Sequence, residues 1–236
     1  PIPMRDFVSP PQLIIIRSFD INNPGTDAEN LKGGVAGGTI LKGVLKVGDF
    51  ISIRPGLITK NQRTGQVECK EIESQIVALK ADENHLMYAV PGGLIGVGML
   101  VDPSLTRADN WVGQIIGHPG KMPEVLSEIE VNYYLLKRLL GVRAAAKKDA
   151  AEGKAASAKV SGLKTEEKLM INVGSQALEG NIVTVKKDTV RIAFTRPVCA
   201  NIGDKIAMSR RVDQNFRLIG WGEIKKCFSQ KDKTKQ

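Results

Sequence analysis

The chain has 236 residues, of which 42% are hydrophobic and 25% are charged, and this length suits one large domain or two ordinary ones. No apolar run approaches the ~20 residues of a membrane-spanning helix, and no signal peptide is recognisable. Cys69, Cys199 and Cys227 form no CxxC pair, so we expect small buried side chains in a reducing, cytoplasmic protein.

The net charge of +9 is concentrated in two segments. Residues 137–168 carry nine basic and four acidic side chains, and residues 210–236 carry eight and three. The rest of the chain holds seventeen basic and eighteen acidic side chains. Clustered positive charge attracts polyanions through counterion release, which indicates nucleic acid as a partner. Two solvated faces without a ligand are the alternative.

Strand signals recur along the first half of the chain. Short β-branched segments lie at residues 13–16, 39–45, 50–54 and 67–79, with Gly, Pro and Asn between them. Many short strands at such spacing are typical of an all-β sandwich or barrel. The stretch VDPSLTRAD at residues 101–109 has the composition of a segment that crosses between domains.

The second half repeats the strand pattern at residues 169–173, 182–185 and 190–194. Residues 133–140 (YYLLKRLL) predict two turns of helix ended by a glycine. Residues 144–164 are rich in Ala, Lys and Gly, and we expect a flexible or partly helical insertion there. The final KDKTKQ is a solvated tail.

These patterns predict two β-barrels, at residues 1–110 and 111–228, followed by a polar tail at 229–236. The chain begins at Pro1 in a linker-like segment, so we expect a piece of a longer protein. Each predicted barrel has the size of an ordinary domain.

A glycine-rich stretch at residues 33–50 reads GGVAGGTILKGVLKVGDF and must be tested as a phosphate loop. Gly33 and Gly38 have the required spacing, but Thr39 and Ile40 replace the Lys and the Ser/Thr. No zinc-ligand spacing and no G-x-S-x-G motif occurs either, so we expect no enzyme in this chain. The glycines indicate either barrel corners or a groove that a ligand backbone approaches closely.

The same stretch resembles the start of the second domain of translational GTPases. The match tightens with PGGLIGVG, DPSLTRAD, RLLGVR, RPVCANIGDKIAMSRRV and RLIGWGEI, which resemble the gamma subunit of eukaryotic and archaeal translation initiation factor two. That family has a GTP-binding domain followed by two β-barrels, called domains II and III, and this chain resembles only the barrels. The resemblance therefore implies that GTP and Mg²⁺ belong to a domain outside this chain, and that the chain itself holds no cofactor.

The resemblance also implies a function and partners. The full factor, a GTP hydrolase, carries methionylated initiator tRNA to the small ribosomal subunit in a GTP-dependent ternary complex. The alpha subunit docks on domain II, and the beta subunit docks on the GTPase domain. By loop length alone, residues 22–31 and 58–68 are candidates for the alpha-docking loop.

Candidate RNA-binding residues follow from the resemblance and from the charge pattern. By resemblance, the loop at Pro91–Gly98 holds the terminal adenosine of tRNA, and the expected lining is Gly93, Leu94, Ile95, Gly96 and Val97. Arg107 could contact a phosphate or form a salt bridge between the barrels. The candidates for the RNA backbone are Arg210, Arg211, Lys225 and Lys226, with one member of each pair expected to be structural.

Other interpretations stay open from the sequence. The barrels could belong to an elongation-type or selenocysteine-specific translational GTPase. The chain could also serve mainly as a scaffold that holds the alpha subunit. A chain that itself hydrolyses GTP is disfavoured because no phosphate loop is present.

Overall fold

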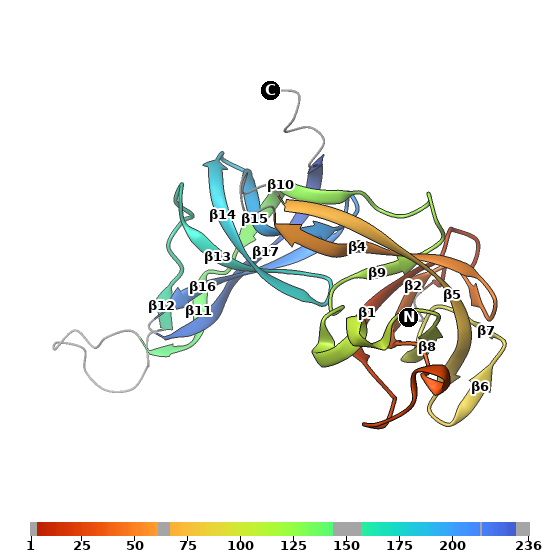
Figure 1. The fold of residues 1–236 in the computed structure, drawn as a ribbon. Coiled ribbons are helices and arrows are strands. Elements are labelled where there is room, and N and C mark those ends of the chain that lie inside the picture. The colour runs from red at the N-terminus through yellow and green to blue at the C-terminus, as the bar shows by residue number, and fades with distance from the viewer. Residues whose placement is uncertain (1–3, 61–66, 144–156, 213, 230–236) are drawn as a thin grey trace, which may run out of the picture. The chain divides into compact units, whose positions relative to one another are not determined.

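The computed structural model describes residues 4–60, 67–143, 157–212 and 214–229. The chain divides into two compact units. The first comprises Pro1–Val125 with Pro197–Cys199, and the second comprises Leu126–Arg196 and Ala200–Gln236. Each unit contains a β-barrel (Figure 1), which confirms the predicted all-β class with two barrels.

The first unit is a seven-stranded sheet with the strand order β4-β9-β1-β2-β8-β5-β6. An additional pairing between β4 and β5 closes six of these strands into a barrel, and β6 extends from β5. A separate two-stranded sheet joins β3 to β7. The bounds are β1 Gln12–Phe19, β2 Val35–Lys42, β3 Leu45–Lys46, β4 Phe50–Lys60, β5 Val67–Ala81, β6 Asn84–Leu86, β7 Tyr88–Ala89, β8 Ile95–Met99 and β9 Ile115–Gly117, with 3-10 helices η1 Ala28–Asn30 and η2 Pro103–Asp109.

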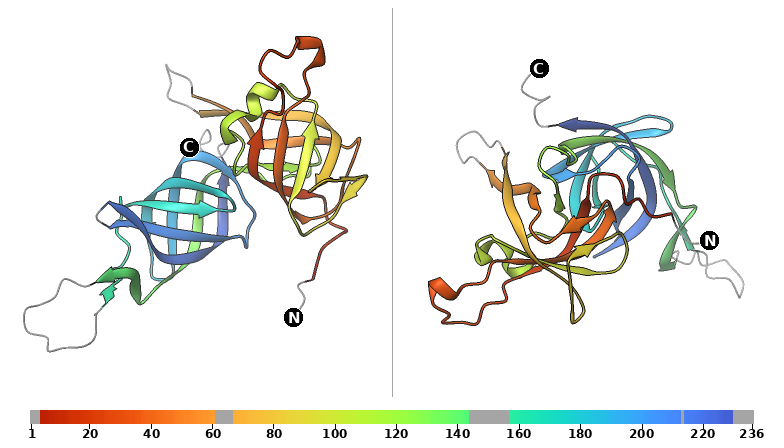
Figure 2. Two further views of the ribbon diagram at one scale, coloured as in Figure 1. Left: turned by 90° about the horizontal axis from the view of Figure 1, so that it is seen from below. Right: turned by 90° about the vertical axis from the view of Figure 1, so that its right-hand side faces the viewer.

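The second unit is a closed barrel with the strand order β10-β15-β14-β13-β16-β17, and Figure 2 shows its ring of strands. A two-stranded sheet joins β11 to β12. The bounds are β10 Val125–Leu135, β11 Arg138–Arg143, β12 Ser157–Lys159, β13 Lys168–Val173, β14 Gln176–Val185, β15 Thr189–Cys199, β16 Lys205–Val212 and β17 Asn215–Ser229.

Alternating burial explains why these segments form barrel strands. In β13, Leu169, Ile171 and Val173 are buried and alternate with more exposed neighbours. Successive side chains of a strand point to opposite faces, so one face fills the barrel and the other faces solvent. Both barrels are filled mainly by Ile, Leu, Val and Met side chains. Within the described residues, no helix is long and apolar enough to cross a membrane.

The opening glycines serve close packing of strands. β2 lies between β1 and β8, and a Cβ on Gly38 would lie 2.1 Å from the carbonyl oxygen of Ile14. A Cβ on Gly33 would lie 1.8 Å from the carbonyl oxygen of Met99. Neither distance is compatible with a side chain, so these glycines let neighbouring backbones approach each other.

The predicted helix at residues 133–140 is wrong. Strand β10 continues to Leu135, and β11 begins at Arg138. Tyr133 and Tyr134 pair with Gly222 and Trp221 of β17, so the segment completes a sheet instead of forming isolated turns. A short apolar run does not by itself distinguish a helix from a strand, and here pairing with β17 decided the outcome.

The predicted crossing segment and insertion also acquire local structure. Residues 103–109 form η2, and their unit extends to Val125 because β9 pairs with β1 and β4. The division between the units therefore falls after residue 125, where the sequence prediction placed it near 110. Within the predicted insertion, β12 pairs with β11, while residues 144–156 lie outside the described residues. Ser229 ends β17, and the remaining tail residues are likewise not described.

Candidate nucleic-acid interface

The loop that precedes β8 presents bare backbone at the surface. Gly92 and Gly93 have φ angles of +106° and +78°, a region that favours glycine. A Cβ on Gly93 would meet nothing within 4 Å, whereas one on Gly92 would lie 3.1 Å from Cζ of Arg5. The backbone at Gly93 is therefore open to a ligand, and the Arg5 guanidinium lies beside the loop.

The predicted lining of this loop divides into surface and core. Ile95 and Val97 are 5% and 0% exposed and belong to the barrel core, so their side chains are not available to a ligand at the surface. Leu94 is 63% exposed. Gly96 pairs with Gly37 of β2. The alternation in IGVGM already carried this signal, because side chains two residues apart share a face of a strand.

Arg107 forms an ion pair within the first unit. Its Nη2 lies 2.9 Å from Oδ2 of Asp20, and its side chain remains 69% exposed. The backbone N–H of Asn22, its side chain and then Arg107 hold the pKa of Asp20 below its ordinary value. Because Asp20 precedes η2 in the same unit, the salt bridge does not join the two barrels as one alternative held.

Arg17 is an exposed arginine that the sequence analysis did not single out. Its Nε donates to Oδ1 of Asp109 at 3.0 Å, and the same oxygen accepts the backbone N–H of Ser18 at 2.9 Å. These bonds hold the pKa of Asp109 below its usual range, the Ser18 bond being the largest cause. The turn at Ala108 and Asp109 has positive φ at both residues, which could not be recognised from residue type alone.

Arg210 is a structural arginine. Its guanidinium bonds to both carboxylate oxygens of Glu167, to the hydroxyl and carbonyl oxygens of Ser161, and to the carbonyl oxygen of Gly162. The side chains of Arg210 and Glu167 are only 17% and 18% exposed. Arg210 therefore ties the segment before β13 to β16, and it is poorly placed to reach RNA.

The other basic candidates of the second unit lie at the surface. Arg211 is exposed on β16, and Lys225 is exposed on β17. Lys226 is 69% exposed, and its Nζ lies 3.9 Å from Glu130. The expected division of the Arg210–Arg211 pair into a structural and an exposed member thus has a geometric basis, since neighbouring strand residues face opposite ways.

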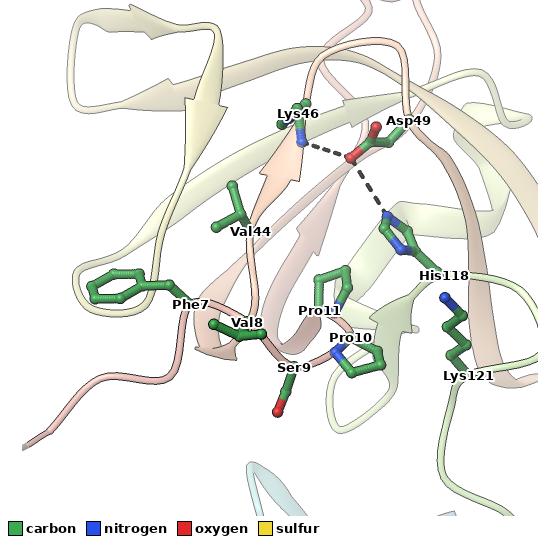
Figure 3. A pocket seen from close by; sticks show the side chains of 10 residues that line it. All are labelled: Phe7, Val8, Ser9, Pro10, Pro11, Val44, Lys46, Asp49, His118 and Lys121. Carbon is green, nitrogen blue, oxygen red and sulfur yellow. Dashed lines mark hydrogen bonds and ion pairs between the residues drawn. The ribbon is translucent and has the colours of Figure 1, made fainter.

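The first unit also contains a cleft of about 470 Å³ that sequence reasoning missed (Figure 3). Phe7, Pro10, Pro11 and Val44 contribute its apolar lining. The segment before β1 is held in place because Oδ1 of Asp6 accepts the backbone N–H groups of residues 8 and 9, at 3.0 and 2.9 Å.

Polar side chains lie on the other side of this cleft. Oδ2 of Asp49 accepts the backbone N–H of Lys46 at 2.8 Å and lies 3.6 Å from Nε2 of His118, as Figure 3 shows. Lys46 and Lys121 add two positive charges. Apolar and basic groups side by side can hold an acidic ligand that also has an apolar part.

Comparison with known proteins places this geometry in a family. Residues 127–224 match the family described as "Initiation factor eIF2 gamma, C terminal". Over 224 residues, the chain is 52% identical to a Drosophila melanogaster protein named "Eukaryotic translation initiation factor 2 subunit 3". This match covers 95% of the chain and 46% of the Drosophila protein, so the chain spans about half the length of that relative.

The matched region includes both barrels, the glycine loop and the basic strands described above. The resemblance found in the sequence motifs is confirmed by the family match and by the identity over nearly the whole chain. This two-barrel chain belongs to the family of eIF2 gamma subunits, which are components of a translation initiation factor.

Proposed function

We propose that this chain is the tRNA-binding and subunit-docking part of a gamma subunit that delivers methionyl initiator tRNA to the small ribosomal subunit. The observation that carries the proposal is the 52% identity to a translation initiation factor subunit over 95% of the chain. In this proposal the ternary complex forms in the cytoplasm. GTP and Mg²⁺ are bound, and GTP is hydrolysed, by a GTPase domain that this chain does not supply.

The distribution of charge supports RNA binding by the second unit. By sequence, the first unit has 12 basic and 13 acidic residues, and the second has 22 basic and 12 acidic residues. A strongly basic barrel attracts the phosphate backbone of RNA through counterion release. Arg211, Lys225 and Lys226 are the surface cations that we assign to this contact.

The first barrel is proposed to receive the aminoacylated 3′ end. An unpaired terminal nucleotide is recognised by stacking, apolar contact and close backbone hydrogen bonds. The open backbone at Gly93 and the exposed side chain of Leu94 suit this role, and Arg5 supplies positive charge next to the loop. Arg107 remains a candidate for a phosphate contact, in competition with Asp20.

The first barrel is also proposed to dock the alpha subunit, while the beta subunit attaches to the GTPase domain. Of the two candidate loops, the one at residues 22–31 has a defined neck. Asn22 donates to the carbonyl oxygen of Lys32 and accepts its backbone N–H, both at 2.7 Å. Ile21 and Leu31 flank this neck and are 47% and 46% exposed, so the loop offers apolar surface to a partner.

Titration of the 236-residue chain with labelled initiator tRNA tests the proposal. We expect weak binding that falls steeply with salt, because the GTPase domain that completes the site is not part of the chain. Nanomolar affinity that is insensitive to salt, or no binding at low salt, would contradict it. An elongator tRNA is the matched control, since an elongation-type relative would prefer it.

A scaffold that mainly holds the alpha subunit is the competing function. Capture of isolated alpha subunit by the chain, measured with and without initiator tRNA, separates the two. A scaffold binds alpha equally well in both cases and binds no tRNA.

A further inference from the structure

An exposed pair of stacked aromatic rings lies on the outer face of the second barrel. Tyr134 of β10 and Trp221 of β17 are register partners, with ring centroids 4.5 Å apart and an interplanar angle of 23°. Their side chains are 52% and 41% exposed. Rings of this size contribute most when they are buried, so a solvent-exposed stack indicates a surface prepared for a partner.

The apolar surface continues along β17 from this pair. Leu218 and Phe216 are 43% and 49% exposed, and they pair with Ser209 and Arg211 of β16. A register shift between β16 and β17 near Met208 and Ser209 lets Phe216, Leu218 and Trp221 all face solvent. We call the four side chains Phe216, Leu218, Trp221 and Tyr134 the aromatic strip.

Basic side chains border the aromatic strip. Nζ of Lys205 lies 5.6 Å from the ring centroid of Trp221. Arg211 is exposed beside Phe216, and Lys225 follows on β17. Glu223, the register partner of Lys205, adds one negative charge to this surface. The surface thus combines flat apolar rings with cations at its border.

This combination matches the chemistry of an unpaired RNA segment. A base stacks on an exposed ring, and Lys or Arg reaches the flanking phosphates. A protein partner would bury the strip too, but it would have to offset the excess of ten positive charges that the second unit carries by sequence. RNA supplies the complementary charge along its whole length.

We propose that the Tyr134–Trp221 pair is a stacking platform for an unpaired RNA base, with Lys205 and Arg211 contacting the neighbouring phosphates. The inference rests on the proposed function, because it assumes that RNA is the natural ligand of this barrel. Base-paired RNA does not fit, since its bases are already stacked inside the helix.

The two tryptophans of the chain make a direct test possible. Trp221 is 41% exposed, and Trp111 is 2% exposed in the first barrel. In the Trp111→Phe variant, Trp221 is the only fluorescent tryptophan, and the wild-type chain is titrated in parallel. A labelled single-stranded 12-nucleotide oligo(A) reports binding by anisotropy, while quenching of tryptophan emission reports stacking.

Three RNA probes then separate stacking from charge. Oligo(A) should bind and quench Trp221. A base-free ribose-phosphate polymer of equal length should bind more weakly without quenching, and a 12-base-pair duplex should also leave Trp221 unquenched. Binding of oligo(A) without quenching, or equal quenching by the base-free polymer, overturns the platform. Absence of oligo(A) binding at low salt also overturns it and leaves the strip as a protein-docking surface.

Variants locate the effect on the barrel surface. Trp221→Ala and Tyr134→Ala should each weaken oligo(A) binding about tenfold to a hundredfold, whereas Trp221→Phe should lose much less. Tyr88→Ala is the matched control, because Tyr88 is an aromatic residue 63% exposed in the first barrel, and its affinity should not change. Equal losses for Tyr88→Ala and Trp221→Ala contradict a specific platform.

Failure of the platform and failure of the proposed function give different results. Salt-dependent binding of initiator tRNA that leaves Trp221 unquenched, with oligo(A) also silent, overturns only the platform. If initiator tRNA does not bind at all, the proposed function fails first.

Discussion

The two barrels share a closed six-stranded architecture but differ in what they expose. The first buries its tryptophan, Trp111, at 2% exposure and is close to neutral by sequence. The second exposes Trp221 at 41% and carries nearly twice as many basic as acidic residues. The first offers concave features, a glycine loop and a cleft, while the second offers a convex aromatic and basic surface.

This difference shows that a barrel constrains its inward-facing residues and leaves the outward-facing ones free to specialise. Inside, both barrels are filled with aliphatic side chains. Outside, cations are either used for structure, as Arg210 is with Glu167, or left at the surface, as Arg211 is. The following predictions test the division, from the largest expected effect to the smallest.

Replacing Gly38 should damage the first barrel most. A Cβ in Gly38→Ala would lie 2.1 Å from a backbone oxygen of β1, so we expect a loss of about 3 kcal/mol of stability from overpacking. Gly93→Ala meets no neighbour and should lose only about 1–2 kcal/mol, through its positive φ. Urea unfolding followed by Trp111 emission measures both. Equal losses at the two positions would remove the distinction between a packing glycine and a loop glycine.

Removing Arg210 should destabilise the second barrel. Arg210→Ala leaves Glu167 largely buried without its cation and releases the segment at residues 161–167, so we expect a loss of about 2–3 kcal/mol. Arg211→Ala is the matched control and should change stability by less than about 0.5 kcal/mol. Urea unfolding followed by circular dichroism compares the two variants. A larger effect at Arg211 would reverse the assignment of structural and exposed arginines.

Charge reversal should separate the barrels by RNA affinity. Arg211→Glu combined with Lys225→Glu should weaken initiator-tRNA binding about tenfold or more and should reduce the salt dependence. Arg17→Glu combined with Arg107→Glu in the first barrel should have a smaller effect, because both arginines already pair with carboxylates. Anisotropy titrations at several salt concentrations provide the measurement. The opposite order would move the main RNA surface to the first barrel.

Alkaline pH should weaken the first unit through Cys199. Burial raises the pKa of this thiol from 9.0 to about 12, so its proton is held more tightly in the folded state. Stability is therefore complete below pH 9 and falls as pH rises from 9 towards 12. We expect a loss of about 1 kcal/mol between pH 8 and pH 10.

Urea unfolding of the wild type and of Cys199→Ala at the two pH values isolates this contribution from other titrating groups. The variant should lose less stability than the wild type over this interval. An identical loss in both proteins would show that Cys199 does not contribute.

Much of the fold was predictable because period-2 burial is a local property of the sequence. The strands around Leu13, Ile51, Leu169 and Ile182 follow from β-branched runs between turn residues. The segment at residues 133–140 was not predictable, since its apolar run suits a helix as well as a strand until β17 is alongside. The boundary near residue 110 was misplaced because β9 joins β1 and β4 only in three dimensions.

The candidate sites were predictable only in part. The exposed position of Leu94 and the core positions of Ile95 and Val97 follow from strand alternation once β8 is recognised. The pairing of Arg17 with Asp109, 92 residues apart, has no local signal. The Tyr134–Trp221 stack likewise joins residues from β10 and β17 that are distant in the chain.

The sequence by itself determined the barrel class, the family resemblance and the location of the excess charge, because residue types, motifs and turn glycines encode them locally. Tertiary structure alone decided which cations are spent on ion pairs, which glycines lie against a neighbouring backbone, and which aromatic rings meet at the surface. Those properties depend on strand register and on partners brought together by barrel closure, and neither can be read from residues that are adjacent in the chain.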